Sequence, residues 1–300
     1  MHDLLNPAQN PVLFAVPFFF LSIAIELAAL KWLDHDDTGL GGIATGYDGK
    51  DTRTSLLMGT GSLVSTTILK IAGLAFYTVI YTHATVWHLP TNTWWYWLAL
   101  LLAQDLLYYG NHRFVHRVNI GWAAHQAHHS SEYMNFGTAL RQKWNPWFEL
   151  AFFLPLPFLG FAPWTIYVAF SFNLIYQFFV HTEQIHKLWR PIELVFNTPS
   201  HHRVHHGSDP EYLDKNYGGI LIVWDRLFGS FQPELKRPTY GLTKPVGTYN
   251  LLKLQYGDYS HIVRNVKAAD SWRDKAGYLF GPPGWQPRTS EPVAPVTARG

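Results

Sequence analysis

The 300-residue sequence contains no cysteine at all. This absence excludes disulfide bonds, cysteine-ligated iron–sulfur clusters and catalysis by a thiolate. Charged residues are also scarce: they make up 15% of the chain, against the roughly 25% of ordinary globular proteins. The net charge of +2 is too small to indicate a nucleic-acid partner.

Aromatic residues, by contrast, are abundant, with 13 Trp, 16 Tyr and 20 Phe, a composition that suits a chain embedded in lipid with aromatic side chains at the water boundaries. Residues 11–32, 71–89 and 94–110 are apolar enough to cross a bilayer, which takes about 17–25 residues. A fourth apolar stretch, 146–181, is broken by prolines and by Gly160, and we expect it to form a hairpin of two short helices. The sequence therefore predicts an all-α integral membrane protein with about four or five membrane segments.

The distribution of basic residues predicts how these segments are oriented. None precedes Lys31, and the short segment 91–93 has none, whereas after Tyr109 they recur at Arg113, Arg117, Arg141, Lys143, Lys187, Arg190 and Arg203. Because positive residues favour the cytoplasmic side, we expect the N-terminus outside and the C-terminal half inside. The membrane would be the inner membrane of a bacterium or the endoplasmic reticulum of a eukaryote.

We expect residues 1–280 to form a single domain, with a loop at 34–56 between the first two membrane segments. The last twenty residues, 281–300, are rich in proline and are expected to be disordered.

The 16 histidines are not spread evenly. The words "HRFVH", "HQAHH" and "HHRVHH" contain histidines spaced by three and four residues, and residues at these spacings share one face of a helix. The eight histidines concerned are His112, His116, His125, His128, His129, His202, His205 and His206. Since one zinc ion takes about four ligands, eight imidazoles indicate two metal ions on the cytoplasmic side. The remaining isolated histidines His2, His35, His83, His88 and His261 are expected to be structural or surface residues.

The ligand type alone does not choose the metal, because imidazole suits iron, zinc, copper and nickel. A carboxylate di-iron bundle would need two ExxH motifs, and the chain has one, Glu183–His186. Haem would need axial histidines in facing spans. A membrane metal transporter is the alternative outside the enzymes, but it would place histidines within the spans rather than just beyond them.

The three histidine words together resemble the signature of the fatty acid hydroxylase/sterol desaturase superfamily. The flanking words "HQAHHSSEYMNFGTALRQ", "FFVHTE" and "NTPSHHRVHHGSDPEYLDKNYGGILIVWDRLFGSF" are similar to the alkylglycerol monooxygenase branch, and the resemblance covers residues 97–231. It implies a membrane-bound non-haem di-iron oxygenase that hydroxylates a C–H bond of a lipid with O2, with cleavage of an alkylglycerol ether as the favoured reaction. A sterol or fatty acyl desaturase or hydroxylase is the alternative.

The resemblance also implies the ligand set. By position it comprises the eight histidines of the three words, with His181 of "FFVHTE" as a ninth. His186 follows five residues later, off the helix face of His181, and is left out. His201 breaks the HxxHH spacing and is expected beside the ligands rather than among them.

An alkyl C–H bond offers neither an acidic proton nor an electrophile, so a cofactor must carry the reaction, and O2 activation at iron is the available route. With no cysteine and no flavin motif, the chain is not expected to supply the electrons itself. A separate electron donor or a reduced pterin is implied.

Three polar residues are candidates for supporting this chemistry. Asp105 lies seven residues before His112, on nearly the same helix face, and is expected to accept a hydrogen bond from a ligand imidazole. Gln177 lies four residues before His181 and is expected to orient it or to line the cavity. The alternative is that its side chain forms a structural hydrogen bond between helices. Glu132 could neighbour the metals or simply face water at a helix end.

Overall fold

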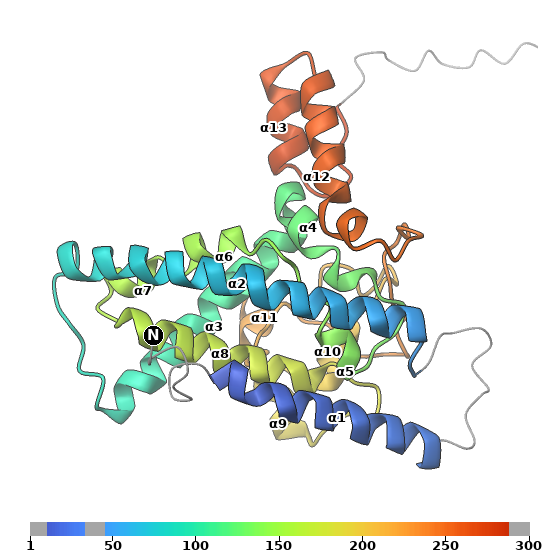
Figure 1. Ribbon diagram of the computed structural model, residues 1–300, viewed down its shortest axis with the longest axis horizontal. Coiled ribbons are helices and arrows are strands. Elements are labelled where there is room, and N and C mark those ends of the chain that lie inside the picture. The colour runs from blue at the N-terminus through green and yellow to red at the C-terminus, as the bar shows by residue number, and fades with distance from the viewer. Residues whose placement is uncertain (1–10, 34–45, 288–300) are drawn as a thin grey trace, which may run out of the picture.

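The computed structural model describes residues 11–33 and 46–287 of the chain (Figure 1). These residues form helices and two isolated β-bridges, and no β-strand is present among them. The expected all-α class is therefore confirmed.

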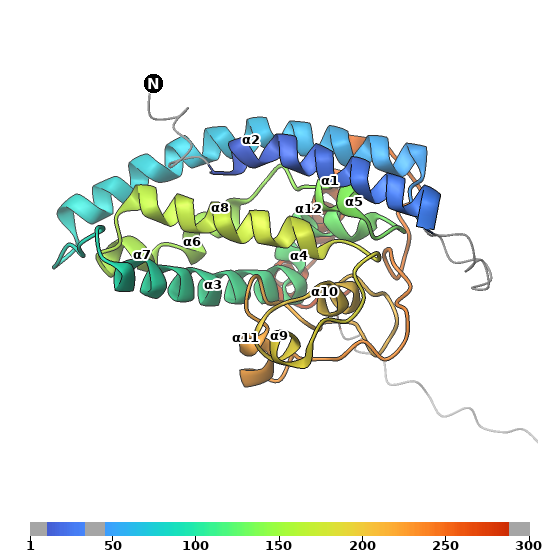
Figure 2. The ribbon, with the colours of Figure 1, turned by 90° about the horizontal axis from the view of Figure 1, so that it is seen from below.

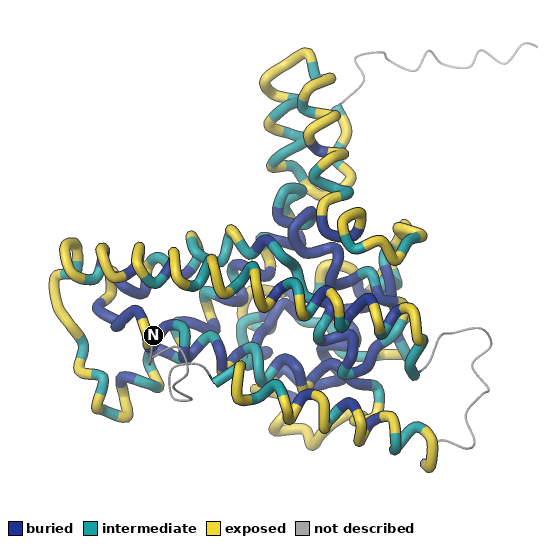
Figure 3. Tube along the Cα trace, viewed as in Figure 1, coloured by how far each residue is buried: buried dark blue, intermediate teal, exposed yellow. Residues whose placement is uncertain are grey.

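Four long helices make the body of the molecule: α1 (Pro11–Leu33), α2 (Gly49–His83), α3 (Trp94–Arg117) and α8 (Pro163–Val180). Helix α8 packs against the other three, and α1, α2 and α8 run alongside one another in both views (Figures 1 and 2). By length and hydropathy, the described residues include two stretches that could cross a membrane, Pro11–Trp32 and Gly49–His83. Both keep many apolar side chains exposed, in contrast to the buried interior of the body (Figure 3).

The second long helix corrects two sequence expectations. It begins at Gly49, inside the expected loop 34–56, and it ends at His83, so that it replaces the expected segment 71–89. Polar residues do not break it because their hydroxyl groups donate to backbone carbonyls one turn earlier. Such bonds are made by Thr54, Ser55, Thr60, Thr66 and Thr67. Residues 34–45 of the expected loop lie outside the described range.

The expected pair of short helices at 146–181 is instead a series of three. Two short helices, α6 (Trp147–Phe152) and α7 (Pro155–Phe158), precede the full-length α8. The chain reverses at Gly160, whose φ is +92° and where a Cβ would lie 2.6 Å from the carbonyl oxygen of Trp87. Only glycine tolerates both conditions, so the break falls at the glycine, and the eighteen residues of α8 beyond it, Pro163–Val180, form one helix.

Short helical elements gather where α3 and α8 end (Figure 2). They are α4 (Asn119–His125), the 3₁₀ turn η2 (His128–Ser130), α5 (Phe136–Ala139), α9 (Arg190–Val195), α10 (Pro199–His205) and α11 (Val223–Leu227). This cap carries most of the clustered histidines.

The C-terminal part forms a helical hairpin of α12 (Leu251–Ala268) and α13 (Trp272–Phe280), which stands off the body across the direction of α2 (Figure 1). Beyond it, the indole of Trp285 packs edge-on against the ring of Tyr278, with 5.1 Å between the ring centroids. The rest of the expected tail, 288–300, lies outside the described residues.

Candidate metal centre

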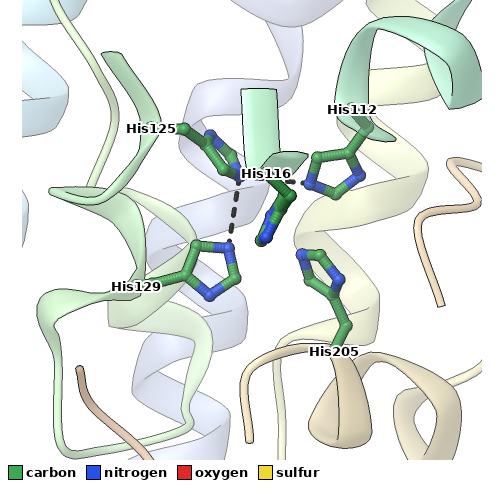
Figure 4. Close-up of side chains that lie close together, drawn as sticks. All are labelled: His112, His116, His125, His129 and His205. Atoms are coloured by element: carbon green, nitrogen blue, oxygen red, sulfur yellow. Dashed lines mark hydrogen bonds between the residues drawn. The ribbon is translucent and has the colours of Figure 1, made fainter. Parts of the chain in front are cut away.

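Nine histidines converge in two adjacent groups, and within each group the potential ligand atoms lie within 4.8 Å of one another. The first group consists of His112, His116, His125, His129 and His205 (Figure 4). The second consists of His128, His181, His202 and His206. The structure therefore brings together all nine histidines that the sequence and the resemblance singled out.

Helix geometry explains how one short motif serves both groups. On α3, His112 and His116 are four residues apart and point the same way. His202 on α10 and His206, which directly follows this helix, face the second group, whereas His205 on α10 faces the first. Neighbouring residues of a helix point about 100° apart, so α10 lies between the groups and contributes to each.

All nine side chains are buried, none more than 8% exposed. Burial lowers the pKa values of all nine below the ordinary value of histidine, and for most of them repulsion from neighbouring imidazoles is the next largest cause. The pKa values of His181 and His205 fall to about 4. The cluster is therefore neutral at physiological pH, which is the form of imidazole that binds metal ions.

Backbone carbonyls fix the tautomer of four of these rings. The Nδ1 atom of His112 lies 2.9 Å from the carbonyl oxygen of Tyr217, and that of His205 lies 3.0 Å from the oxygen of Lys215. His128 and His181 make the same contact with the oxygens of Arg141 and Gln177. A carbonyl oxygen can only accept, so in each ring Nδ1 carries the proton and Nε2 presents a lone pair.

This assignment leaves two lone pairs face to face. The Nε2 atoms of His128 and His181 are 3.3 Å apart, and neither carries a proton. Two acceptors this close repel each other unless a cation lies between or beside them. Nitrogen atoms that share one metal ion at about 2.1 Å are separated by roughly 3 Å, which matches the observed spacing.

Other buried ring nitrogens have no hydrogen-bond partner among residues 11–33 and 46–287, namely Nε2 of His116, His205 and His206 and Nδ1 of His125 and His202. A buried polar atom without a partner costs about 1–3 kcal/mol. The Nε2 atoms of His116, His205 and His206, which belong to the two groups, fit the donor set of two metal ions. His125 and His202 instead direct Nε2 toward neighbouring imidazoles of their groups, so their Nδ1 atoms lie on the other side of the ring.

Asp105 does not contact an imidazole, so the expected hydrogen bond to a ligand histidine is wrong. Its carboxylate accepts from the backbone N–H groups of Ile220 and Leu221 and from the side chains of Trp224 and Asn173, at 2.8–3.0 Å. The loop approaches so closely that a Cβ at Gly219 would lie 2.8 Å from Asp105 Oδ1. Asp105 thus anchors the loop whose Tyr217 carbonyl orients His112, because the helix turns its carboxylate toward this loop rather than toward the rings.

The side chain of Gln177 lies in the cavity wall and bonds to the neighbouring helix α3, whereas the contact with His181 is made by its backbone. Its backbone oxygen accepts from His181, while its side chain accepts from Tyr108 and donates to Asn173. The side chain of Glu132 is exposed and outside both histidine groups, so it faces water and the reading of a carboxylate beside the metals is wrong. His201 is held away from both groups by Glu193, whose carboxylate lies 3.0 Å from its Nε2, and His186 is exposed.

The sequence analysis did not identify two buried acidic residues near the metal centre. Glu26 of α1 accepts hydrogen bonds from Tyr47, Thr182 and the N–H of Phe136. Asp51 of α2 pairs with Arg141 at 2.7 Å, and the Arg141 carbonyl orients His128. A signal for Glu26 was available, because an isolated ionisable residue in an apolar span is a functional candidate by default.

A cavity of about 680 Å³ adjoins the histidines. His125, His128 and His181 lie in its wall, and apolar side chains of α1, α2 and α8 line about half of the rest, among them Phe19, Leu63 and Leu174. Cavities of a few hundred Å³ with apolar walls and a few polar groups are typical of sites for small molecules.

Fold and site together define a helical protein with two buried polyhistidine groups that could hold metal ions, beside an apolar cavity. Residues 97–230 match the family model described as fatty acid hydroxylase. The match confirms the resemblance noted in the sequence.

The chain is also similar to alkylglycerol monooxygenases. It is 40% identical to that of Danio rerio over 91% of this chain and 59% of the relative. For the Homo sapiens protein the values are 38%, 95% and 63%, and for the Xenopus tropicalis protein 41%, 79% and 53%. The chain thus spans little more than half of the length of these relatives. No solved structure matches it.

Proposed function

We propose that the protein is a membrane-bound non-haem di-iron oxygenase that hydroxylates a C–H bond of a lipid with O2, of the type that cleaves alkylglycerol ethers. The observation that carries the proposal is the pair of opposed, unprotonated Nε2 atoms of His128 and His181, in a cluster of nine buried imidazoles next to an apolar cavity. Similarity to alkylglycerol monooxygenases over most of the chain supports the reaction type.

Each histidine group would hold one iron ion. The five imidazoles around His112 would bind the first ion and the four around His181 the second. Bound iron would supply the activation of O2 that no side chain can provide. The carbonyls of Tyr217, Arg141, Gln177 and Lys215 keep the protons on Nδ1, so that each Nε2 is available to a metal without loss of a proton.

The cavity would bind the alkyl chain. Apolar side chains in its wall exclude water, and each buried CH2 group of a substrate contributes ~0.8 kcal/mol. Hydroxylation takes one oxygen atom from O2, and two electrons and two protons reduce the other to water. At the carbon next to an ether oxygen, the product is a hemiacetal, which breaks into an aldehyde and an alcohol.

Two electrons must come from outside the chain, and we propose a reduced pterin or a separate electron carrier as the donor. Four or five membrane segments, drawn from the long helices and the 147–180 region, would place the histidine end on the cytoplasmic side, where a soluble donor can reach it. Residues 1–280 would act as one domain.

The test is turnover by the purified protein reconstituted with iron. Alkylglycerol and O2, with and without a reduced pterin, should give fatty aldehyde, and metal analysis should give about two irons per chain. Turnover of a sterol or acyl lipid, with no aldehyde from alkylglycerol, would instead assign the protein to a sterol or fatty acyl branch of the superfamily. Absence of bound metal after reconstitution would contradict the di-iron proposal itself.

A further inference from the structure

We infer that the α12–α13 hairpin is an interfacial element that lies along the surface of the membrane and binds lipid through its exposed apolar face. The inference rests on the membrane location within the proposed function. It concerns a part of the chain, residues 251–280, that lies outside the fatty acid hydroxylase match.

The base of the hairpin is fixed to the metal centre. Leu254 is buried against Met58 and Ala127, and Ala127 stands between two of the clustered histidines. The side chain of Gln255 donates to the backbone oxygen of Gln142 and accepts from the N–H of Trp144. The hairpin therefore keeps a set direction relative to the histidine groups.

One side of α12 is largely uncovered by the other described residues; the Trp144 ring, edge-on to that of Tyr256 with 6.5 Å between the centroids, is its contact with the body. Leu252, Tyr256 and Val263 are 62%, 41% and 50% exposed, and spacings of four and eleven residues put them on one face of the helix. On α13, Trp272 is 85% and Phe280 64% exposed. Large apolar side chains that lie together on one exposed helix face are not stabilising in water. We therefore infer that a binding partner covers this face.

Charge and direction indicate lipid as the covering partner. The hairpin carries five basic residues, Lys253, Arg264, Lys267, Arg273 and Lys275, against the three aspartates Asp258, Asp270 and Asp274. The amino group of Lys275 lies 5.0 Å from the centre of the Trp272 ring. Apolar residues with tryptophan on one face and basic residues beside them are typical of helices that lie in the headgroup region.

The position of the hairpin agrees with this partner. Candidate spans α1 and α2 run along the body, and the hairpin projects across them (Figure 1). If α1 and α2 cross the bilayer, an element across their direction runs along its plane. The hairpin would then hold the histidine end of the protein at a constant depth below the lipid surface.

The absence of cysteine allows a direct test, because a single introduced cysteine is the only site for a thiol-reactive label. Val263→Cys and His261→Cys are a matched pair: both positions are exposed on α12, and they point about 200° apart. Phe18→Cys on the exposed face of α1 reports membrane insertion. Each full-length variant is labelled with an environment-sensitive fluorophore in nanodiscs and quenched with doxyl-labelled phosphatidylcholine or with aqueous iodide.

We expect the label at position 263 to be quenched by the doxyl lipid and protected from iodide, and the label at 261 to show the reverse. Replacing phosphatidylcholine partly by phosphatidylglycerol should strengthen lipid quenching at 263, and the double change Lys253→Gln and Lys267→Gln should remove that gain.

Equal iodide quenching at 261 and 263, with lipid quenching retained at 18, would overturn the inference and leave the membrane proposal intact. Protection of 263 from both quenchers would also overturn it, because protein rather than lipid would then cover the face. Loss of lipid quenching at 18 would instead contradict the membrane location within the proposed function.

Discussion

Glu26 and Thr182 lie 156 residues apart in the chain, yet the Thr182 hydroxyl donates a hydrogen bond to the Glu26 carboxylate. Thr182 directly follows His181 of the second histidine group. The same carboxylate accepts from Tyr47 and from the N–H of Phe136 at 2.8 Å. An acidic side chain of the first apolar helix thus ties that helix to the turn that presents a candidate metal ligand.

Replacing Glu26 should therefore disturb the second histidine group more than the first. Glu26→Ala leaves three donors without their acceptor. The hydroxyl of Thr182 is buried, at a cost of about 1–3 kcal/mol, and Tyr47 and Phe136 are half-buried. We expect a lower thermal midpoint and a loss of metal from the group around His181. Thr182→Val removes one of the three bonds and should have a smaller effect in the same direction. Unchanged metal content and stability in Glu26→Ala would show that the tie does not position His181.

The two histidine groups should lose metal separately. We expect His205→Ala to weaken the first site and His128→Ala the second, so that each variant retains roughly one of two ions and loses turnover. Metal analysis by mass spectrometry measures the loss. His186→Ala is the matched control, because this histidine is exposed and outside both groups; full activity in His128→Ala or His205→Ala would contradict the assignment.

Asp105→Ala should act on His112 through the loop between them. Loss of its carboxylate frees the N–H groups of Ile220 and Leu221, and the Tyr217 carbonyl then holds His112 less firmly. We expect a decrease of about 10–100-fold in metal affinity or activity, as for other residues that orient ligands.

Asp105→Asn should be nearly as harmful, because both carboxylate oxygens accept two hydrogen bonds each and an amide group would face donors with its own N–H. Metal titration and thermal unfolding of both variants test this. A fully functional Asp105→Asn would mean that one acceptor atom is enough.

Narrowing the cavity should select against long substrates. Ser171 is buried in the cavity wall on α8, so Ser171→Phe removes space for the alkyl chain while the histidines stay untouched. We expect kcat/KM to fall more for a long-chain alkylglycerol than for a short one, since each unburied CH2 loses ~0.8 kcal/mol. Ser171→Ala controls for the hydroxyl, and an equal decrease for both chain lengths would place the substrate elsewhere.

Metal removal should destabilise the fold near the cap. Without metal, the lone pairs of His128 and His181 face each other and several buried ring nitrogens have no partner. We therefore expect chelation to lower the thermal midpoint and to increase amide exchange in α10, and iron to restore both. The His128→Ala variant should respond less to chelation than the unaltered protein, and an equal response would argue against metal at this group.

The sequence by itself determined the features that depend on local spacing and composition. The apolar length of 11–32 fixed a long helix there, because no other backbone hydrogen bonds are available to a chain in lipid. The HxxxH and HxxHH words fixed which imidazoles can point together, because residues three and four apart share a helix face. The local sequence pattern predicted the wrong bounds for α2, because serine and threonine hydroxyl groups donate hydrogen bonds to the carbonyls of the same helix and do not end it.

Only the tertiary structure decided which histidines meet across helices. His205 and His206 are neighbours in the chain, but α10 lies between the two groups and sends them to different ones. It also decided that Asp105 faces a loop 115 residues away rather than His112, and that Glu26 reaches Thr182. Helical periodicity sets the directions in which side chains point around one helix axis. Which residues of other helices they meet depends on how the helix axes pack, and the packing depends on residues throughout the chain.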